Sequence, residues 1–158
     1  MMAAKHKGGV RERALRPEVA RVLLVDGDVT TRLTLKAVLQ ASGYAIDSAA
    51  SAPEAMDKLE RQEYDLVLCG VRPETQDECR RVISHARAQE YKPATALLTA
   101  SGDQSRRAWE HPKSSRLLVE PQEVPALLTK IADLLADRAA GRERRNMRRR
   151  NGELVSVN

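Results

Sequence analysis

The chain has 158 residues, enough for one folded domain with tails, and 42% of them are hydrophobic. Aromatic residues make up only 3% and phenylalanine is absent, which predicts an aliphatic core. The net charge of +5 is unevenly distributed, because residues 1–21 and 138–158 carry +4 and +5 whereas residues 22–137 carry −4. No apolar run approaches the roughly 20 residues of a membrane span, and no secretory signal is recognisable. We therefore expect a cytoplasmic protein that does not bind membranes.

Short apolar runs alternate with amphipathic stretches through the middle of the chain. In chain order, the pattern predicts strands over residues 22–25, 44–49, 66–69, 94–99 and 117–119. The intervening patterns predict helices over residues 30–42, 51–62, 76–90, 101–110 (weakly) and 124–137, with a loop over 70–75. Asp28 is expected to cap the first helix, and Ser51 with Glu54 forms a capping-box pattern before the second.

Five strand–helix units in strict alternation predict an α/β fold with a parallel sheet covered by helices on both faces. Right-handed, short connections favour a flavodoxin-like doubly wound sheet with the strand order 2-1-3-4-5. The domain is expected over residues 21–137, between a basic N-terminal tail (1–20) and an arginine-rich C-terminal tail (138–158). In such a sheet, ligands bind beyond the carboxyl ends of the strands.

The segments at these strand ends resemble one family. Residues 22–28 look like the first strand and acidic turn of the response-regulator receiver domain. Further similar segments follow in the family's order and spacing at residues 42–44, 54–56, 64–68, 97–100 and 120–121. The resemblance covers residues 21–135 and implies a module of two-component signalling.

The resemblance also implies a set of roles. In an active receiver, an aspartate at the tip of the third strand accepts a phosphoryl group from a histidine kinase, and Mg²⁺ held by acidic residues neutralises the developing charge. Here the acceptor position falls on Gly70, or on Cys69 if the short loop is aligned differently, and neither residue forms an aspartyl phosphate. Asp65 lies at the opposite end of the strand, too far away to substitute. These residues predict a domain that is not phosphorylated.

Other positions of the family's site also differ. Asp26 matches the first residue of the acidic pair, but Gly27 stands at the second, so we expect no tightly bound metal and no cofactor. Glu120, before Pro121, replaces the family's lysine and would repel a phosphoryl group. The whole receiver pocket is expected to comprise Asp26, Gly27, Asp28, Gly70, Thr99, Leu117, Glu120 and Pro121.

Two of these pocket residues concern signalling inside the domain. Thr99 stands at the position of the family's signalling hydroxyl. The alternative is a strand-end threonine that is hydrogen-bonded to the backbone. Leu117 replaces the aromatic switch residue and, being aliphatic, has no polar tip to move between buried and exposed states.

Other kinds of site are less well supported. Cys69 and Cys79 lack metal-ligand spacing and are interpreted as incidental reduced thiols. No histidine is placed beside Cys69 by the sequence, so an enzymatic thiol is disfavoured. A dinucleotide site would need a glycine-rich turn where Asp26 and Asp28 stand. We expect no enzymatic activity.

The hypothesis is a pseudo-receiver that binds signalling proteins without being phosphorylated. The expected partner face is built from the fourth helix, fifth strand and fifth helix, and carries Arg106, Arg107, Trp109 and Arg116. Trp109 is expected either to be exposed there as the main binding residue or to belong to the core, and both interpretations stay open. Two alternatives remain open: an unorthodox but active phosphoacceptor, and an adaptor whose basic tail binds nucleic acid or an acidic protein. That tail is either functional or merely solvated, and its basic residues are Arg138, Arg142, Arg144, Arg145, Arg148, Arg149 and Arg150.

Overall fold

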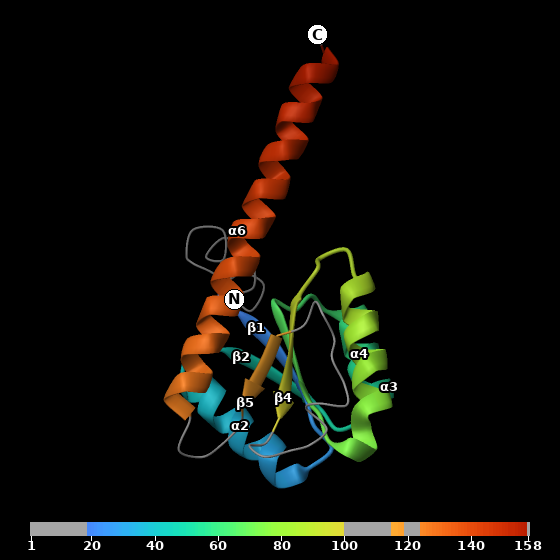
Figure 1. Cartoon of the computed structure of the whole chain (residues 1–158), viewed down its shortest axis with the longest axis vertical. Coiled ribbons are helices and arrows are strands. Elements are labelled where there is room, and N and C mark those ends of the chain that lie inside the picture. Colours follow the sequence, from blue (N-terminus) through green and yellow to red (C-terminus); the bar gives the residue numbers. More distant parts are fainter. Residues whose placement is uncertain (1–18, 100–114, 119–123, 158) are drawn as a thin grey trace, which may run out of the picture.

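The structure, a computed structural model, describes residues 19–99, 115–118 and 124–157, and side chains over 19–99 and 124–151. Five strands form one parallel sheet in the order β2-β1-β3-β4-β5 (Figure 1). The strands are β1 (Arg21–Val25), β2 (Ala45–Ala49), β3 (Leu66–Gly70), β4 (Ala94–Thr99) and β5 (Ser115–Leu118). The predicted flavodoxin-like order is therefore confirmed. β5 begins two residues before the predicted strand, and Val119 lies outside the described residues.

Alternation along the strands sends side chains to both faces of the sheet, and each face has its own aliphatic core. On one face, Leu23, Val67 and Leu97 are buried in a cluster with residues of α3 (Ala52–Arg61) and α4 (Gln76–Ala88). On the other face, the neighbouring strand residues are buried with α2 (Val29–Ala41) and α6 (Val124–Val157). Among the described residues, helices thus cover both faces (Figure 1), which explains why the central strands β1 and β3 carry apolar residues on both sides.

The predicted caps position the helices that follow the strands. Asp28 caps α2, since its carboxylate accepts a hydrogen bond from the Thr31 backbone N–H at 2.9 Å. Ser51 caps α3 by accepting from the Glu54 N–H at 3.4 Å. The capping-box prediction needs one correction: the Glu54 carboxylate bonds the N–H of Ala50, one residue before the cap (3.0 Å). Within the predicted loop, a short 3₁₀ turn, η1 (Pro73–Thr75), leads into α4.

The C-terminal helix is longer than predicted. α6 packs on the sheet through the predicted face, with Leu127 and Ile131 buried and three further leucines half-buried. It then continues past Asp137 to Val157, so the arginine-rich segment projects from the domain as a helix (Figure 1). Gly141 weakens a helix by about 1 kcal/mol, which the flanking helix formers evidently outweigh. The predicted helix at 101–110 lies outside the described residues.

Candidate functional site at the carboxyl ends of the strands

The carboxyl ends of the parallel strands lie at one edge of the sheet, and Asp26 is the central residue of the site at that edge. It follows β1 directly, and its backbone N–H donates to the Ala49 carbonyl at the end of β2 (3.0 Å). Its side chain is only 3% exposed. Oδ1 of this carboxylate accepts a hydrogen bond from the Asp28 N–H at 2.9 Å, which fixes the side chain in the turn.

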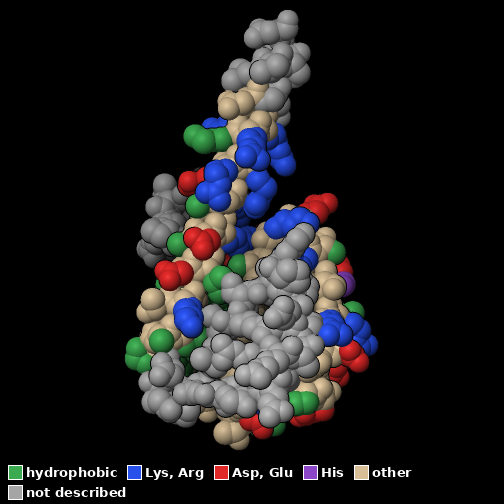
Figure 2. All heavy atoms as spheres, viewed as in Figure 1, with side chains coloured by type: hydrophobic (Ala, Val, Ile, Leu, Met, Phe, Trp, Pro, Cys, Tyr) green, Lys and Arg blue, Asp and Glu red, His purple; other side chains and the backbone are tan. Residues whose placement is uncertain are grey.

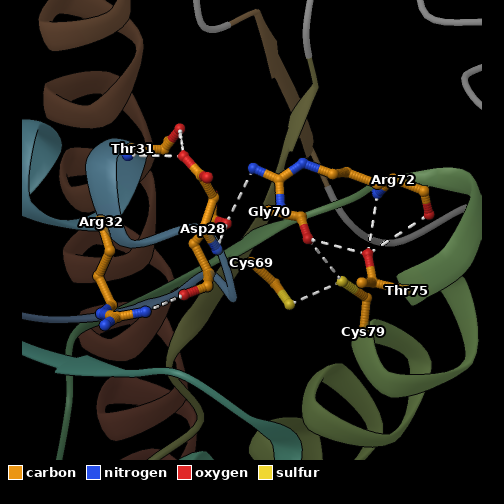
Figure 3. Close-up of polar contacts among 9 residues, drawn as sticks. Asp28, Thr31, Arg32, Cys69, Gly70, Arg72, Thr75 and Cys79 are labelled. Carbon is orange, nitrogen blue, oxygen red and sulfur yellow. Dashed lines mark hydrogen bonds and ion pairs between the residues drawn. The ribbon is translucent and has the colours of Figure 1, made fainter.

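Arg72 supplies the positive charge that the buried carboxylate needs. Its Nη2 lies 3.1 Å from Asp26 Oδ1, and the Arg72 side chain is 34% exposed. The loop that carries it is held by the Arg72 N–H, which donates to Thr75 Oγ1 at 2.9 Å (Figure 3). Arg72 was not among the site residues predicted from the sequence. The available signal was its place two residues beyond the tip of β3, at the sheet edge where Asp26 also ends a strand.

The two glycines of the pocket differ in what a side chain would meet. A Cβ at Gly70 would collide with Asp26 Oδ2 and lie 2.8 Å from Asp26 Cγ. A Cβ at Gly27 would lie 3.6 Å from the nearest neighbouring atom, the Ala50 carbonyl oxygen, which is an ordinary contact. The Asp26 carboxylate therefore fills the space beside the tip of β3. A side chain at position 70 requires Asp26 to move, whereas one at position 27 does not.

Little space remains among these groups. The cavity lined by the acidic turn, the start of α3, the tip of β3 and the start of α4 has a volume of about 10 Å³. This is about the room that one water molecule needs. Mg²⁺ favours six oxygen ligands and keeps several waters, so these residues do not fit the metal that the family's site implies. In the described part of the chain, no group of three metal-ligating side chains comes together.

Asp28 is a cap, as expected, rather than a ligand of the pocket. Oδ2 accepts from both the backbone N–H and the hydroxyl of Thr31, at 2.9 and 2.6 Å. These hydrogen bonds lower the pKa of the Asp28 carboxyl. Because the charged form is the one that is bonded, this cap is at full strength above the unfolded-state pKa and weakens as the pH falls through the lowered one.

Thr99 ends β4 and is 3% exposed, yet its hydroxyl has no hydrogen-bond partner among the described residues. The backbone-bonded alternative is thus not what the described residues show. Leu117 pairs with Leu98 across β4 and β5, and Arg116 with Leu97. The other predicted positions, Glu120 and Pro121 of the pocket and Arg106, Arg107 and Trp109 of the partner face, lie outside the described residues.

Cys69 and Cys79 meet beneath the tip of β3. Their sulfurs are 2.8 Å apart, and Cys79 Sγ donates to the Gly70 carbonyl at 3.1 Å (Figure 3). Both thiols are free and buried. The hydrogen bond to Cys79 and burial raise the pKa of Cys69. The histidine nearest in sequence to Cys79, His85, instead faces Glu60 at 2.7 Å.

We expect neither thiol to react with 5,5′-dithiobis(2-nitrobenzoate) at pH 8 in the folded protein, because both thiols are buried away from the reagent and the raised pKa of Cys69 leaves it with little thiolate. In 6 M guanidinium chloride both should react within minutes. The measurement is absorbance at 412 nm. Rapid reaction of one thiol in native buffer would contradict the burial and point to an accessible nucleophile.

A second polar cluster, which was not predicted from the sequence, lies at the opposite edge of the sheet. Arg138 of α6 donates three hydrogen bonds: Nη1 to Asp65 Oδ1 (2.8 Å), Nη2 to the Tyr91 carbonyl (2.7 Å) and Nε to the Lys92 carbonyl (3.1 Å). Oδ2 of Asp65 accepts from the Arg21 N–H (2.8 Å), at the start of β1. The Arg138 side chain is only 11% exposed. Arg138 is therefore a structural clamp and not part of a free tail.

Comparison with known proteins agrees with this geometry. The sequence model of the response regulator receiver domain matches residues 22–130. A 55-residue stretch is 38% identical to the sensor protein EvgS of Escherichia coli, of whose length this chain spans only 5%. Among described residues, no helix combines the length and apolar character needed to cross a bilayer.

Solved structures show the same fold. The response regulator TrrA of Thermotoga maritima, in complex with Mg²⁺ and BeF, is 27% identical, with a TM-score of 0.62 over 73% of this chain and 99% of TrrA. NtrX of Brucella abortus is 18% identical, with a TM-score of 0.72 over 85% of this chain and 30% of NtrX. The strand order, the acidic turn and the matched sequence model together show that the chain belongs to the response regulator receiver domain family.

Proposed function

We propose that this receiver domain works without phosphorylation, as a protein–protein interaction module of two-component signalling in the cytoplasm, with no catalytic activity of its own. The observation that carries the proposal is the ion pair between Arg72 and Asp26 beside a glycine at the tip of β3. Gly70 offers no carboxylate to a phosphoryl donor. The carboxylate of Asp26 is already paired with the Arg72 guanidinium, where an active receiver would use Mg²⁺.

The Arg72–Asp26 ion pair supplies the positive charge that Mg²⁺ supplies in an active receiver. A phosphoryl group brings negative charge that Mg²⁺ would offset in an active receiver. Here the guanidinium is covalently part of the domain, so the carboxylate is neutralised in every molecule and at any Mg²⁺ concentration. A domain of this kind has one resting arrangement of its pocket, and its signal then depends on whether the protein is present rather than on its phosphorylation.

The partner face proposed from the resemblance includes β5, which is the edge strand of the sheet, and the adjoining face of α6. Arg116 is the residue of this face that lies in β5. We propose that signalling proteins dock there and that Arg106, Arg107 and Trp109 contribute, with Trp109 providing the largest share of the binding energy.

The test uses the two reagents that report an active receiver pocket. With Mg²⁺ and beryllofluoride together, the melting temperature of this protein should not change by more than 1 °C, because no acceptor carboxylate is present to bind the mimic. With acetyl phosphate and Mg²⁺, mass spectrometry should find no added phosphoryl group. TrrA of T. maritima, whose structure is known with Mg²⁺ and BeF, is the positive control.

Two outcomes would overturn the proposal. One is a rise of several degrees in melting temperature that needs both Mg²⁺ and beryllofluoride. The other is an acid-stable, hydroxylamine-labile phosphoryl adduct on any aspartate or glutamate, which would identify the chain as an active phosphoacceptor with an unorthodox acceptor residue.

A further inference from the structure

A basic surface lies on α6 and the adjoining end of the sheet, far from the receiver pocket. A cleft of about 280 Å³ separates the stem of α6 from the start of β4. Its walls carry four positive side chains, Arg87, Lys92, Arg138 and Arg145, against a single acidic one, Asp137. Figure 2 shows Lys and Arg side chains along the projecting part of α6 and at the nearby end of the domain.

A row of arginines continues from this cleft along the helix. Arg142, Arg145 and Arg149 follow Arg138 by four, seven and eleven residues, which places all of them on one face of α6. We call these three residues the arginine stripe. Burial is the main cause that lowers the pKa of Arg138, and the positive charges of Arg142 and Arg145 are close enough to lower it further. The stripe therefore begins at the cleft and leads away from the domain.

The arginines of the projecting helix lack acidic partners. Residues 142–151 are all exposed. In the described ranges, no carboxylate forms an ion pair with Arg142, Arg144, Arg145, Arg148, Arg149 or Arg150. Several of them stand three or four residues apart, where like charges repel each other and oppose the helix. A polyanion along the stripe would remove this repulsion.

The side chains of the projecting part of α6 indicate which kind of partner this surface can bind. A peripheral membrane helix needs an apolar face, and a protein interface needs buried aromatic or aliphatic anchors. Met147 is the large exposed hydrophobic residue that the described part of α6 provides. Single-stranded nucleic acid is bound through aromatic stacking, and residues 124–158 contain no aromatic residue. Duplex DNA needs only cations spaced along its backbone, and its major groove admits a helix.

We propose that the arginine stripe and the adjoining cleft bind the phosphate backbone of duplex DNA with little sequence preference. The guanidinium groups of the stripe contact successive phosphates, and Lys92 and Arg87 contact the backbone where it passes the domain. This proposal is independent of the one about phosphorylation, because it concerns the opposite edge of the sheet.

The test measures fluorescence anisotropy of a labelled 20-bp duplex with the full-length protein between 50 and 300 mM KCl. The wild type should bind with an affinity that falls steeply with salt. In the stripe variant R142Q/R145Q/R149Q, loss of three phosphate contacts should make the slope of log K against log [KCl] shallower by about 2.7. Its affinity near 0.1 M KCl should be at least about tenfold weaker, given the release of about 0.9 counterions per contact.

The matched control compares Arg150→Gln with Arg149→Gln, because each variant removes one charge from the same part of the helix but Arg150 lies outside the stripe, about 100° around the helix from Arg149. Arg150→Gln should weaken binding clearly less than Arg149→Gln, because its side chain points away from the phosphates that the stripe contacts. Glutamine is a good helix former, so all of these variants should keep the far-ultraviolet circular dichroism of the wild type.

Any of four results would overturn the proposal. The first is no binding of the duplex at 50 mM KCl, and the second is equal weakening by Arg149→Gln and Arg150→Gln. The third is tighter binding of a 20-nucleotide single strand than of the duplex. The fourth is tighter binding of phosphatidylglycerol vesicles or polyglutamate than of the duplex at equal charge concentration.

Discussion

Replacing Arg138 with alanine should lower the free energy of unfolding by about 2–4 kcal/mol, measured by urea denaturation. The side chain is 11% exposed and donates to Asp65 and to the carbonyls of Tyr91 and Lys92. Alanine would remove the Arg138 donor from Asp65 Oδ1 and from both carbonyls, and a hydrogen bond to a charged group contributes more than a neutral one. The change should also decrease helical circular dichroism, since this contact holds α6 where it leaves the sheet.

Two control variants distinguish the effect of the three Arg138 hydrogen bonds from the effect of its positive charge alone. Arg142 is the next arginine on the same face and is exposed, so Arg142→Ala should alter stability by less than about 0.5 kcal/mol. Arg138→Lys keeps the charge but not the planar fork that reaches three acceptors, and should recover less than half of the loss. If Arg138→Ala and Arg142→Ala had equal effects, the clamp would contribute no stability.

The second large effect is expected in the receiver pocket. Replacing Arg72 with alanine should lower the free energy of unfolding by about 2–3 kcal/mol, because Asp26 would become a buried carboxylate without a counter-ion. The figure is below the usual range for fully buried pairs, since the Arg72 side chain is 34% exposed and water can reach its place. Urea denaturation at pH 7 is again the measurement.

Adding Asp26→Asn to Arg72→Ala tests the cause. An amide carries no charge to be neutralised, so the double variant should regain at least half of the lost stability. As a surface reference, Arg61 pairs with Asp57 at 3.2 Å with both side chains largely exposed, and Arg61→Ala should change stability by less than about 0.5 kcal/mol. No recovery in the double variant would mean that Arg72 acts through its packing and not through its charge.

The sequence predicted the frame of this domain because the frame depends on local patterns. Apolar runs such as 22–25 and 66–69 mark strands covered on both faces, and Asp28 and Ser51 are caps whose chemistry is local. The strand order follows from general rules about connections. These features were confirmed, with small shifts at most element ends and one large difference, since α6 runs to Val157 and not to Asp137.

The two ion pairs were not predicted, because each partner is chosen by the tertiary structure. In the sequence, Arg72 is an ordinary loop arginine. Only the pairing of β3 with β1 brings it next to Asp26. Arg138 reads as the first residue of a basic tail, and its partners stand 46 to 73 residues earlier in the chain. One signal was present: Arg138 lies seven residues after Ile131, on the face of α6 that is buried against the sheet.

Because α6 is one continuous helix, a small rotation where it leaves the sheet moves its far end by a much larger distance. From Arg138 to Val157 the helix rises about 29 Å, at 1.5 Å per residue. A tilt of 10° at the clamp would therefore carry the far end through about 5 Å. Small adjustments between β4 and α6, of the size that docking of another protein on the edge of the sheet can cause, would be amplified at the tip.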